Sequence, residues 1–276
     1  MSDKIPNSRR NLDIAIERIF SANKNQLQVR TLLANTIVGQ LLPNGVVKGG
    51  SALKFRYGDM TTRFTRDFDT ARAESLEAFI EQLDAALKGG WHGFTGRVVR
   101  KEPSKPKGVP GEYIIQPFEI KLAYSGKSWV TVPLEIGHDE IGDTDNFDYY
   151  ISPEIVVLFK KLGFPAPNPI PLMQIHHQIA QKLHAISAAG SERAHDIIDL
   201  QVIEKCETID YLLTKSTCER LFIFRRQQEW PPTIIKGEGW DTLYASQIGG
   251  LDVLPEIDMA IAWANDLITT IENAIT

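Results

Sequence analysis

The first half of the chain combines two hydrophobic periods. Apolar residues recur every three or four positions in some segments, which predicts helices over residues 11–20, 27–42 and 75–87. Further along, apolar and polar residues alternate, which predicts antiparallel strands over residues 96–99, 113–122 and 129–136. Helices that accompany antiparallel strands in this way are typical of an α+β domain with a mixed sheet.

Helical spacing dominates the second half of the chain. After Pro153 it predicts four helices, over residues 172–188, 192–205, 209–224 and 256–275. Between the halves lies a stretch rich in Asp, Gly and Asn, residues 141–152, which is typical of a connection between domains. We therefore expect a mixed-sheet domain with N-terminal helices over residues 1–150 and a helical domain over residues 151–276.

Composition and charge narrow the class of protein. With 276 residues, 43% of them hydrophobic, the chain can bury a large core. A net charge of −5 argues against a uniformly basic nucleic-acid-binding surface, although a local basic groove is compatible with it. No apolar stretch approaches the roughly 18 residues that would span a bilayer, and the first residues lack a signal-peptide core. Cys206 and Cys218 have no metal or disulfide spacing, so we expect a cytoplasmic protein without a membrane segment.

A glycine-rich turn follows a short apolar strand. The strand is expected over residues 46–48, the turn is Gly49-Gly50-Ser51, and a helix is expected over residues 51–57. The N-terminus of a helix favours anions, because its dipole is positive there and its first N–H groups have no partner within the helix. The turn therefore predicts a cradle for phosphate groups.

Two acids lie on the next expected strand, residues 64–72. Asp67 and Asp69 are two residues apart, so both carboxylates would point to one face of the strand while Phe68 turns into the core. Two hard oxygen ligands at this separation suit Mg²⁺, which is commonly held by a few carboxylates together with substrate phosphates. The phosphate cradle and the acids together indicate nucleotidyl transfer. The alternative is an ordinary turn beside a surface strand with solvated acids.

Glu135 is a candidate third carboxylate. It alternates with apolar residues on the strand expected over residues 129–136. If this strand lies beside the strand of Asp67 and Asp69, Glu135 would complete the metal shell or act as a base. Otherwise it is a solvent-facing residue on a half-buried strand, and the sequence leaves both interpretations open.

Lys182 lies on an apolar stripe of the helix expected over residues 172–188. Ile179 and Ile186 precede and follow it at helical spacing, and a lysine in such a place is unusual unless it is paired. Its ammonium would either extend to solvent or enter a cleft and bind a triphosphate, and we favour the cleft.

Arg193, Asp196 and Asp199 are spaced three apart and share one face of the following helix. Two like charges on one face repel unless a cation lies between them. One interpretation is a surface pair of Arg193 with Asp196 and a spare acid, which contributes little to stability. The other makes one aspartate a base, or a group that orients Lys182 or a nucleotide.

These motifs resemble those of the AbiEii/AbiGii-type nucleotidyltransferase toxins, a group that includes the MenT toxins of mycobacteria. The resemblance is carried by the segments 48–53, 63–69 and 193–200 together with Lys182. Its more specific part is the combination of Lys48-Gly49-Gly50 with the Asp-x-Asp pair. Thr65 stands where the family usually has serine, and His176 and His177 lie where the family carries a glutamate early in the lysine helix.

The resemblance implies a polymerase-β-like nucleotidyltransferase core followed by a helical C-terminal domain. It also implies the toxin of a toxin–antitoxin or phage-defence system, neutralised by a separately encoded antitoxin. Such an enzyme would use an NTP and Mg²⁺ to add nucleotides to an RNA, as some members do at the 3′ end of tRNA. The residues expected to bind the nucleotide are Gly49, Gly50, Ser51, Lys182, Arg193 and Asp196. The expected metal ligands are Asp67 and Asp69, with Glu135 as our candidate third, and the expected catalytic residues are Asp67, Asp69, Lys182 and Asp199.

Two other functions fit the same motifs. A nucleotidyltransferase acting on a small molecule would need the cradle and the acids, but no basic groove around Arg63, Arg66, Arg225 and Arg226. Its substrate binding would be less sensitive to salt than RNA binding. A regulator that binds GTP without transferring a nucleotide would need the cradle but not both aspartates.

Overall fold

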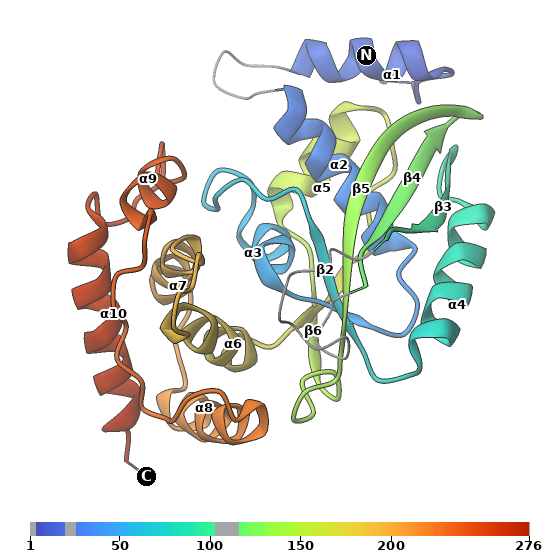
Figure 1. Ribbon diagram of the computed structural model, residues 1–276. Coiled ribbons are helices and arrows are strands. Elements are labelled where there is room, and N and C mark those ends of the chain that lie inside the picture. Colours follow the sequence, from blue (N-terminus) through green and yellow to red (C-terminus); the bar gives the residue numbers. More distant parts are fainter. Residues whose placement is uncertain (1–3, 20–25, 103–115, 276) are drawn as a thin grey trace. The chain divides into compact units, whose positions relative to one another are not determined.

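The computed structural model describes residues 4–19, 26–102 and 116–275 (Figure 1). The beginning of the strand expected over residues 113–122 therefore lies outside the described residues. In the part of the chain that is described, no helix is both long and apolar enough to cross a membrane.

The described residues form helices in both halves of the chain and strands mostly in the first. The helices are α1 (Arg9–Ile19), α2 (Gln26–Gln40), α3 (Gly49–Tyr57), α4 (Leu76–Gly89), α5 (Pro153–Lys161), α6 (Ile175–Ser187), α7 (His195–Cys206), α8 (Tyr211–Arg225), α9 (Trp240–Ala245) and α10 (Ile257–Glu272). The strands are β1 (Val46–Val47), β2 (Phe68–Arg72), β3 (Phe94–Arg100), β4 (Phe118–Tyr124), β5 (Lys127–His138), β6 (Phe147–Tyr150) and β7 (Ile170–Met173).

The strands form one mixed sheet in the order β3-β4-β5-β2-β1-β7-β6. Strands β3, β4 and β5 are antiparallel neighbours, as the alternating sequence predicts. Strand β2 is parallel to β5 and antiparallel to β1, and β1 is parallel to β7. The predicted α+β class with a mixed sheet is therefore confirmed.

One face of the sheet carries the hydrophobic core. In β4 the residues Phe118, Ile120, Leu122 and Tyr124 are buried, whereas the residues between them are partly exposed. They belong to a cluster that also takes in side chains from α2, α4 and α5. Because side chains alternate along a strand, the polar residues of β2, β4 and β5 point to the opposite face.

Two compact units can be distinguished, and they are interleaved in the sequence. Of the described residues, unit 1 holds 4–19, 26–58, 65–102, 116–139 and 148–172, and unit 2 holds 59–64, 140–147 and 173–275. Unit 1 thus contains almost the whole sheet, together with α5, although α5 follows the domain boundary expected at residue 150. Unit 2 contains the C-terminal helices and two short earlier segments, residues 59–64 and 140–147.

Unit 2 is a set of packed helices that the apolar spacing predicts well. Helices α6, α7, α8 and α10 fall within or near the expected segments, but α6 begins later than expected because residues 170–173 form β7. The short helix α9 is fixed by Tyr244, which is buried. Its hydroxyl donates a hydrogen bond to the Leu254 carbonyl oxygen at 2.7 Å and accepts one from Gln201 Nε2 at 3.0 Å.

Candidate active site

The two acids predicted to share a site in the sheet are neighbours in register. Asp69 of β2 lies opposite Glu135 of the parallel strand β5. Phe68 is buried in the core, so Asp69 and Glu135 both point to the polar face of the sheet. Asp69 is half-buried and Glu135 is exposed. The condition on which the candidacy of Glu135 depended, that its strand lies beside the aspartate strand, is therefore met.

The start of α3 adjoins the Asp69 carboxylate. The helix begins at Gly49, earlier than the expected residue 51, so both glycines belong to its first turn. Gly49 has a φ of 62°, and a methyl group built on it would lie 2.2 Å from Asp69 Oδ2. Glycine is required here both by its backbone conformation and by the closeness of the carboxylate. The first N–H groups of α3 have no acceptor within the helix, and this end of the helix adjoins Asp69.

The Ser51 side chain is hydrogen-bonded within the protein. It is buried, and its hydroxyl donates a hydrogen bond to the Asp67 carbonyl oxygen at 2.6 Å. Asn35 Nδ2 lies 3.4 Å from the same hydroxyl. Ser51 therefore ties α3 to the segment that carries Asp67, and contact with a triphosphate would fall to its backbone N–H.

Asp67 lies outside the strand on which it was expected. Strand β2 begins at Phe68, not at residue 64, and the Asp67 side chain is exposed. The prediction that the aspartates sit on one strand is therefore wrong for Asp67. The four residues before Phe68 do not continue the strand. Thr65 is buried at a position that the alternation of β2 would leave exposed, and the Ser51 hydroxyl binds the carbonyl oxygen of Asp67.

The acids of unit 1 fit an ion that completes its shell from substrate. Among residues 4–19, 26–102 and 116–275, no group of three or more His, Cys, Asp or Glu side chains is arranged to hold a metal ion. Asp69 and Glu135 offer two carboxylates and no closed cage. This donor set suits Mg²⁺, which is bound through one or two carboxylates, water and substrate phosphates, and it does not suit a structural zinc site.

In unit 2, Lys182 lies between the two aspartates predicted to accompany it. Its ammonium is 2.7 Å from Asp196 Oδ1 and 2.6 Å from Asp199 Oδ2. Arg193 Nε donates to Asp196 Oδ2 at 2.8 Å. Arg63 binds Asp199 through two hydrogen bonds of 2.9 Å, one to each carboxylate oxygen.

Burial distinguishes this cluster from a surface ion pair. The side chains of Lys182, Asp196 and Asp199 expose 6%, 0% and 3% of their surface. The interpretation of Lys182 as a residue that extends to solvent is therefore wrong, as is that of Asp196 as a surface acid. Arg63, for which the sequence indicated only a possible RNA contact, is the partner that the motif spacing did not reveal, because it is 136 residues from Asp199.

The charges of the cluster stabilise one another. Burial alone would raise the pKa of Asp196, but Lys182 and Arg193 outweigh it and hold that pKa well below the ordinary value. Burial would likewise raise the pKa of Asp199, which Arg63 and Lys182 hold low. Burial opposes the charge of Lys182, yet both aspartates raise its pKa above the ordinary value. All three groups are therefore ionised at neutral pH.

Two histidines of unit 2 are buried. His177 and His184 both lie in α6 with little exposed surface. His184 Nδ1 is 3.2 Å from Arg225 Nη1, and Arg225 is itself paired with Glu140. Burial, with the nearby Arg225, lowers the pKa of His184 to about 4. Arg225 is thus engaged within unit 2, which weakens its candidacy as an RNA contact.

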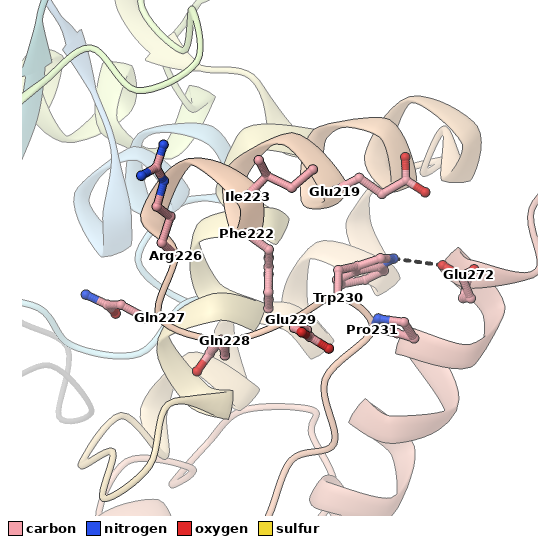
Figure 2. A pocket seen from close by; sticks show the side chains of 10 residues that line it. All are labelled: Glu219, Phe222, Ile223, Arg226, Gln227, Gln228, Glu229, Trp230, Pro231 and Glu272. Atoms are coloured by element: carbon pink, nitrogen blue, oxygen red, sulfur yellow. Dashed lines mark hydrogen bonds between the residues drawn. The ribbon is translucent and has the colours of Figure 1, made fainter.

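A separate pocket of about 680 Å³ lies in unit 2 (Figure 2). It is lined by the last turns of α8, the residues that follow them and Glu272 of α10. The Trp230 indole N–H donates to Glu272 Oε2 at 2.7 Å, and the Phe222 ring packs edge-on against Trp230. None of the residues predicted to bind the nucleotide or the metal lines this pocket, so we do not assign nucleotidyl transfer to it.

Comparison with known proteins decides the family. The model of the nucleotidyltransferase AbiEii toxin of type IV toxin–antitoxin systems matches residues 31–264. The chain belongs to the AbiEii family. Its members are nucleotidyltransferase toxins, so the predictions of a transferase and of an antitoxin partner are supported at the level of the family. No protein with a curated description matches the chain by sequence.

The superposition on the MenT4 structure agrees with this assignment at the level of the fold. The nucleotidyltransferase toxin MenT4 of Mycobacterium tuberculosis H37Rv superposes with a TM-score of 0.60 at 16% identity, over 98% of this chain and 91% of that one. A protein of H. pylori described as a nucleotidyltransferase gives a TM-score of 0.46 at 14% identity, over 91% and 96% of the two chains. JHP933 of Helicobacter pylori gives 0.42 at 15% identity, over 89% and 90%. The AbiEii-family chain thus has the expected nucleotidyltransferase fold with a helical C-terminal region.

Proposed function

We propose that this AbiEii-family protein is a cytoplasmic toxin that transfers a nucleotide from an NTP to an RNA, with the 3′ end of a tRNA as the favoured acceptor. The observation that carries the proposal is the register of Asp69 with Glu135 beside the start of α3. Carboxylates next to the N-terminus of a helix combine ligands for a cation with N–H donors for phosphate oxygens.

In this proposal the residues of unit 1 bind and orient the triphosphate. The N–H groups of Gly49, Gly50 and Ser51 receive phosphate oxygens at the start of α3, where the helix dipole favours negative charge. Asp69 and Glu135, joined by Asp67, would hold Mg²⁺, and the ion would neutralise charge on the phosphates as pyrophosphate leaves. The protein contributes mainly by positioning the reactants, because phosphoryl chemistry of this kind needs no covalent step on the enzyme.

The charged cluster of unit 2 has a second proposed role. Lysine has three N–H donors, and two of those of Lys182 are engaged by Asp196 and Asp199. We assign the third to a phosphate oxygen of the nucleotide, with the aspartates as the groups that orient the ammonium. Arg193, which is more than half exposed, is assigned to the nucleotide as well.

The direct test is transfer of label from each of the four NTPs to total tRNA in the presence of Mg²⁺. We expect labelled tRNA with the parent protein and none with Asp67→Ala or Asp69→Asn. The matched control is Glu119→Gln, because Glu119 lies on the same face of the sheet but is paired with Lys121. Label in tRNA with Asp69→Asn would refute the metal assignment, and no transfer by a folded parent that binds NTP would refute the RNA substrate.

Toxicity provides the second test. Induced expression in a bacterial host should arrest growth with the parent and with Glu119→Gln, and not with Asp69→Asn at equal protein level. Co-expression of the antitoxin encoded beside the gene should restore growth. Arrest by Asp69→Asn would separate toxicity from the proposed chemistry.

Substrate binding distinguishes the small-molecule alternative. If the acceptor is RNA, its apparent affinity should fall steeply between 50 and 200 mM salt, whereas a small neutral acceptor would show little change. The GTP-binding regulator requires that the parent binds GTP with no turnover, and that Asp69→Asn binds GTP equally well.

A further inference from the structure

Lys48 belongs to the same face of the sheet as the acids. It is the residue before α3, and its backbone N–H donates to the Asp69 carbonyl oxygen at 2.9 Å, which extends the antiparallel pairing of β1 with β2 by one residue. Residues that face each other across such a pair point to the same side. The Lys48 side chain therefore leaves the sheet on the side of Asp69 and Glu135.

The end of this side chain lies over Gly137 of β5. A methyl group built on Gly137 would be 2.8 Å from Lys48 Nζ and 3.4 Å from its Cε. Gly137 is in register with Ala71 of β2, so the residues beneath the lysine are the two smallest available. Gly137 is also two residues beyond Glu135, on the same face. The absence of a side chain at position 137 is what leaves room for the ammonium.

The ammonium has no partner in the protein as far as the structure describes it. Lys48 is half-buried, yet its side chain makes no hydrogen bond and no ion pair within 4.0 Å with any described residue. A partly desolvated charge without a counter-ion is unfavourable in the unliganded protein. If Lys48 served only to neutralise the acids, its ammonium would be expected within ion-pairing distance of Asp69 or Glu135. Instead it extends past them to Gly137.

We propose that Lys48 binds a phosphate oxygen of the incoming NTP, and that Gly137 is the positioning residue that allows its ammonium to lie there. This inference rests on the proposed nucleotidyl transfer. A lysine binds phosphate as a point charge. The acids of this face attract cations, so the anion that Lys48 receives is one that arrives with its own cation, as the triphosphate of an NTP does.

The closeness of Gly137 to Lys48 permits a displacement test. Gly137→Ala should leave the fold intact, because its new methyl group collides only with the flexible end of the Lys48 side chain, the Thr70 carbonyl oxygen at 3.5 Å is at ordinary contact distance, and the backbone there has no positive φ. It should push the ammonium aside. Lys48→Ala removes the ammonium altogether, and the double variant removes the collision. Lys127→Ala, an exposed lysine at the start of β5, is the control for loss of one positive charge.

The measurements are the KM and kcat for NTP in tRNA labelling, the Kd for each NTP with Mg²⁺, the Kd for tRNA, and Tm. We expect Lys48→Ala to raise the KM and Kd for NTP roughly 10- to 100-fold, the effect of losing one charged hydrogen bond. Gly137→Ala should raise them less, and the double variant should be no worse than Lys48→Ala. Tm, the Kd for tRNA and the Lys127→Ala variant should be nearly unchanged.

Each other outcome counts against the inference in a distinguishable way. If the parent transfers nucleotides and Lys48→Ala binds NTP as the parent does, the Lys48 assignment fails and the proposed function stands. If the effect appears in the Kd for tRNA instead, the phosphate belongs to RNA and the assignment to NTP fails. If the effects of the two substitutions simply add, Gly137 does not act through Lys48. If the folded parent binds no NTP, the proposed function itself fails.

Discussion

The Asp69 carboxylate lies against Gly49, so closely that a methyl group at position 49 would come within 2.2 Å of Asp69 Oδ2. The first turn of α3 and the acid of β2 are thus fitted to each other, although 20 residues separate them in the sequence. A fit this close makes the position of the carboxylate depend on the glycine. Substitution of Gly49 should therefore displace the carboxylate as well as strain the backbone, whereas a glycine with positive φ and no close neighbour would only strain the backbone.

Gly49→Ala should therefore reduce activity more than stability. Its φ of 62° makes alanine cost about 1–2 kcal/mol, and Asp69 must rotate away from the new methyl group. The control is Gly126→Ala in unit 1, with a φ of 72° and no heavy atom within 4 Å of the new methyl group. We expect similar losses of stability in urea denaturation for the two variants, but transfer reduced at least about 100-fold only in Gly49→Ala. Equal activities would show that the carboxylate position is unimportant.

Glu135→Gln should change the Mg²⁺ dependence of the reaction. If Glu135 is the second carboxylate beside Asp69, its loss should raise the Mg²⁺ concentration for half-maximal activity by roughly 10-fold, with little loss of stability because the side chain is exposed. The measurement is a Mg²⁺ titration of labelling beside Glu119→Gln. An unchanged titration curve would remove Glu135 from the metal site and restore its interpretation as a solvated glutamate.

The local patterns of the sequence predict most of the fold, for a physical reason. Long helices and alternating strands each bury one face, so their apolar residues recur with a regular period in the sequence. The elements that lie close to their predicted positions include α2, α4, β5 and α8. The short elements β6, β7, α5 and α9 were not predicted. Segments of four to nine residues contain too few turns or alternations to establish a period.

The sequence suggests candidate residues for the site but does not show their contacts. The order of a glycine turn and two acids suggests chemistry, yet only the register of β2 with β5 places Glu135 beside Asp69. That register is set by packing between distant parts of the chain. The same applies to Arg63, whose bond to Asp199 joins residues far apart in the sequence. The spacing of three residues indicated the pair of Arg193 and Asp196, and the two are paired although Arg193 lies just before α7 begins at His195.

Lys182→Met should strongly destabilise unit 2. It leaves Asp196 and Asp199 buried without the ammonium they share, and breaking a buried pair in this way costs about 3–5 kcal/mol. The matched control is Lys236→Met, because Lys236 is also paired with two aspartates, Asp241 and Asp258, but both are exposed. Little change is expected there. Chemical denaturation followed by a probe in unit 2 makes the comparison, and equal losses would mean that burial of the cluster has no energetic weight.

Lys182→Met should also change how the stability of unit 2 depends on pH. Lowered pKa values of Asp196 and Asp199 stabilise the parent above the ordinary aspartate value near 4, and this stability is lost as pH falls through the lower, folded values. The parent should therefore vary little in stability through this cluster between pH 7 and 5. In Lys182→Met, a buried carboxylate deprived of its cation should take up a proton more readily. The free energy of unfolding should therefore rise as the pH falls from 7 to 5. A free energy of unfolding that falls as the pH is lowered from 7 to 5 would contradict this account.

His184 should make unit 2 sensitive to mild acid. Its pKa of about 4 in the folded chain lies below the unfolded value near 6.5, so the unfolded chain binds the proton more readily. Stability from the neutral ring should be complete above pH 6.5 and should decline between pH 6.5 and 4, when protonation would bring a second cation to Arg225. Because one pKa unit corresponds to about 1.4 kcal/mol, the decline should be about 3 kcal/mol or less.

The measurement for His184 is the free energy of unfolding across this pH range. His184→Asn, which keeps an acceptor for Arg225 and does not titrate, should make the decline shallower, whereas His92→Asn at an exposed position in unit 1 should leave it as in the parent. His195, whose pKa burial and Arg63 also lower to about 4, should contribute independently, so that only a variant lacking both His184 and His195 is flat. An NMR titration in which the His184 ring protonates near pH 6.5 would show instead that burial and Arg225 do not hold the ring neutral.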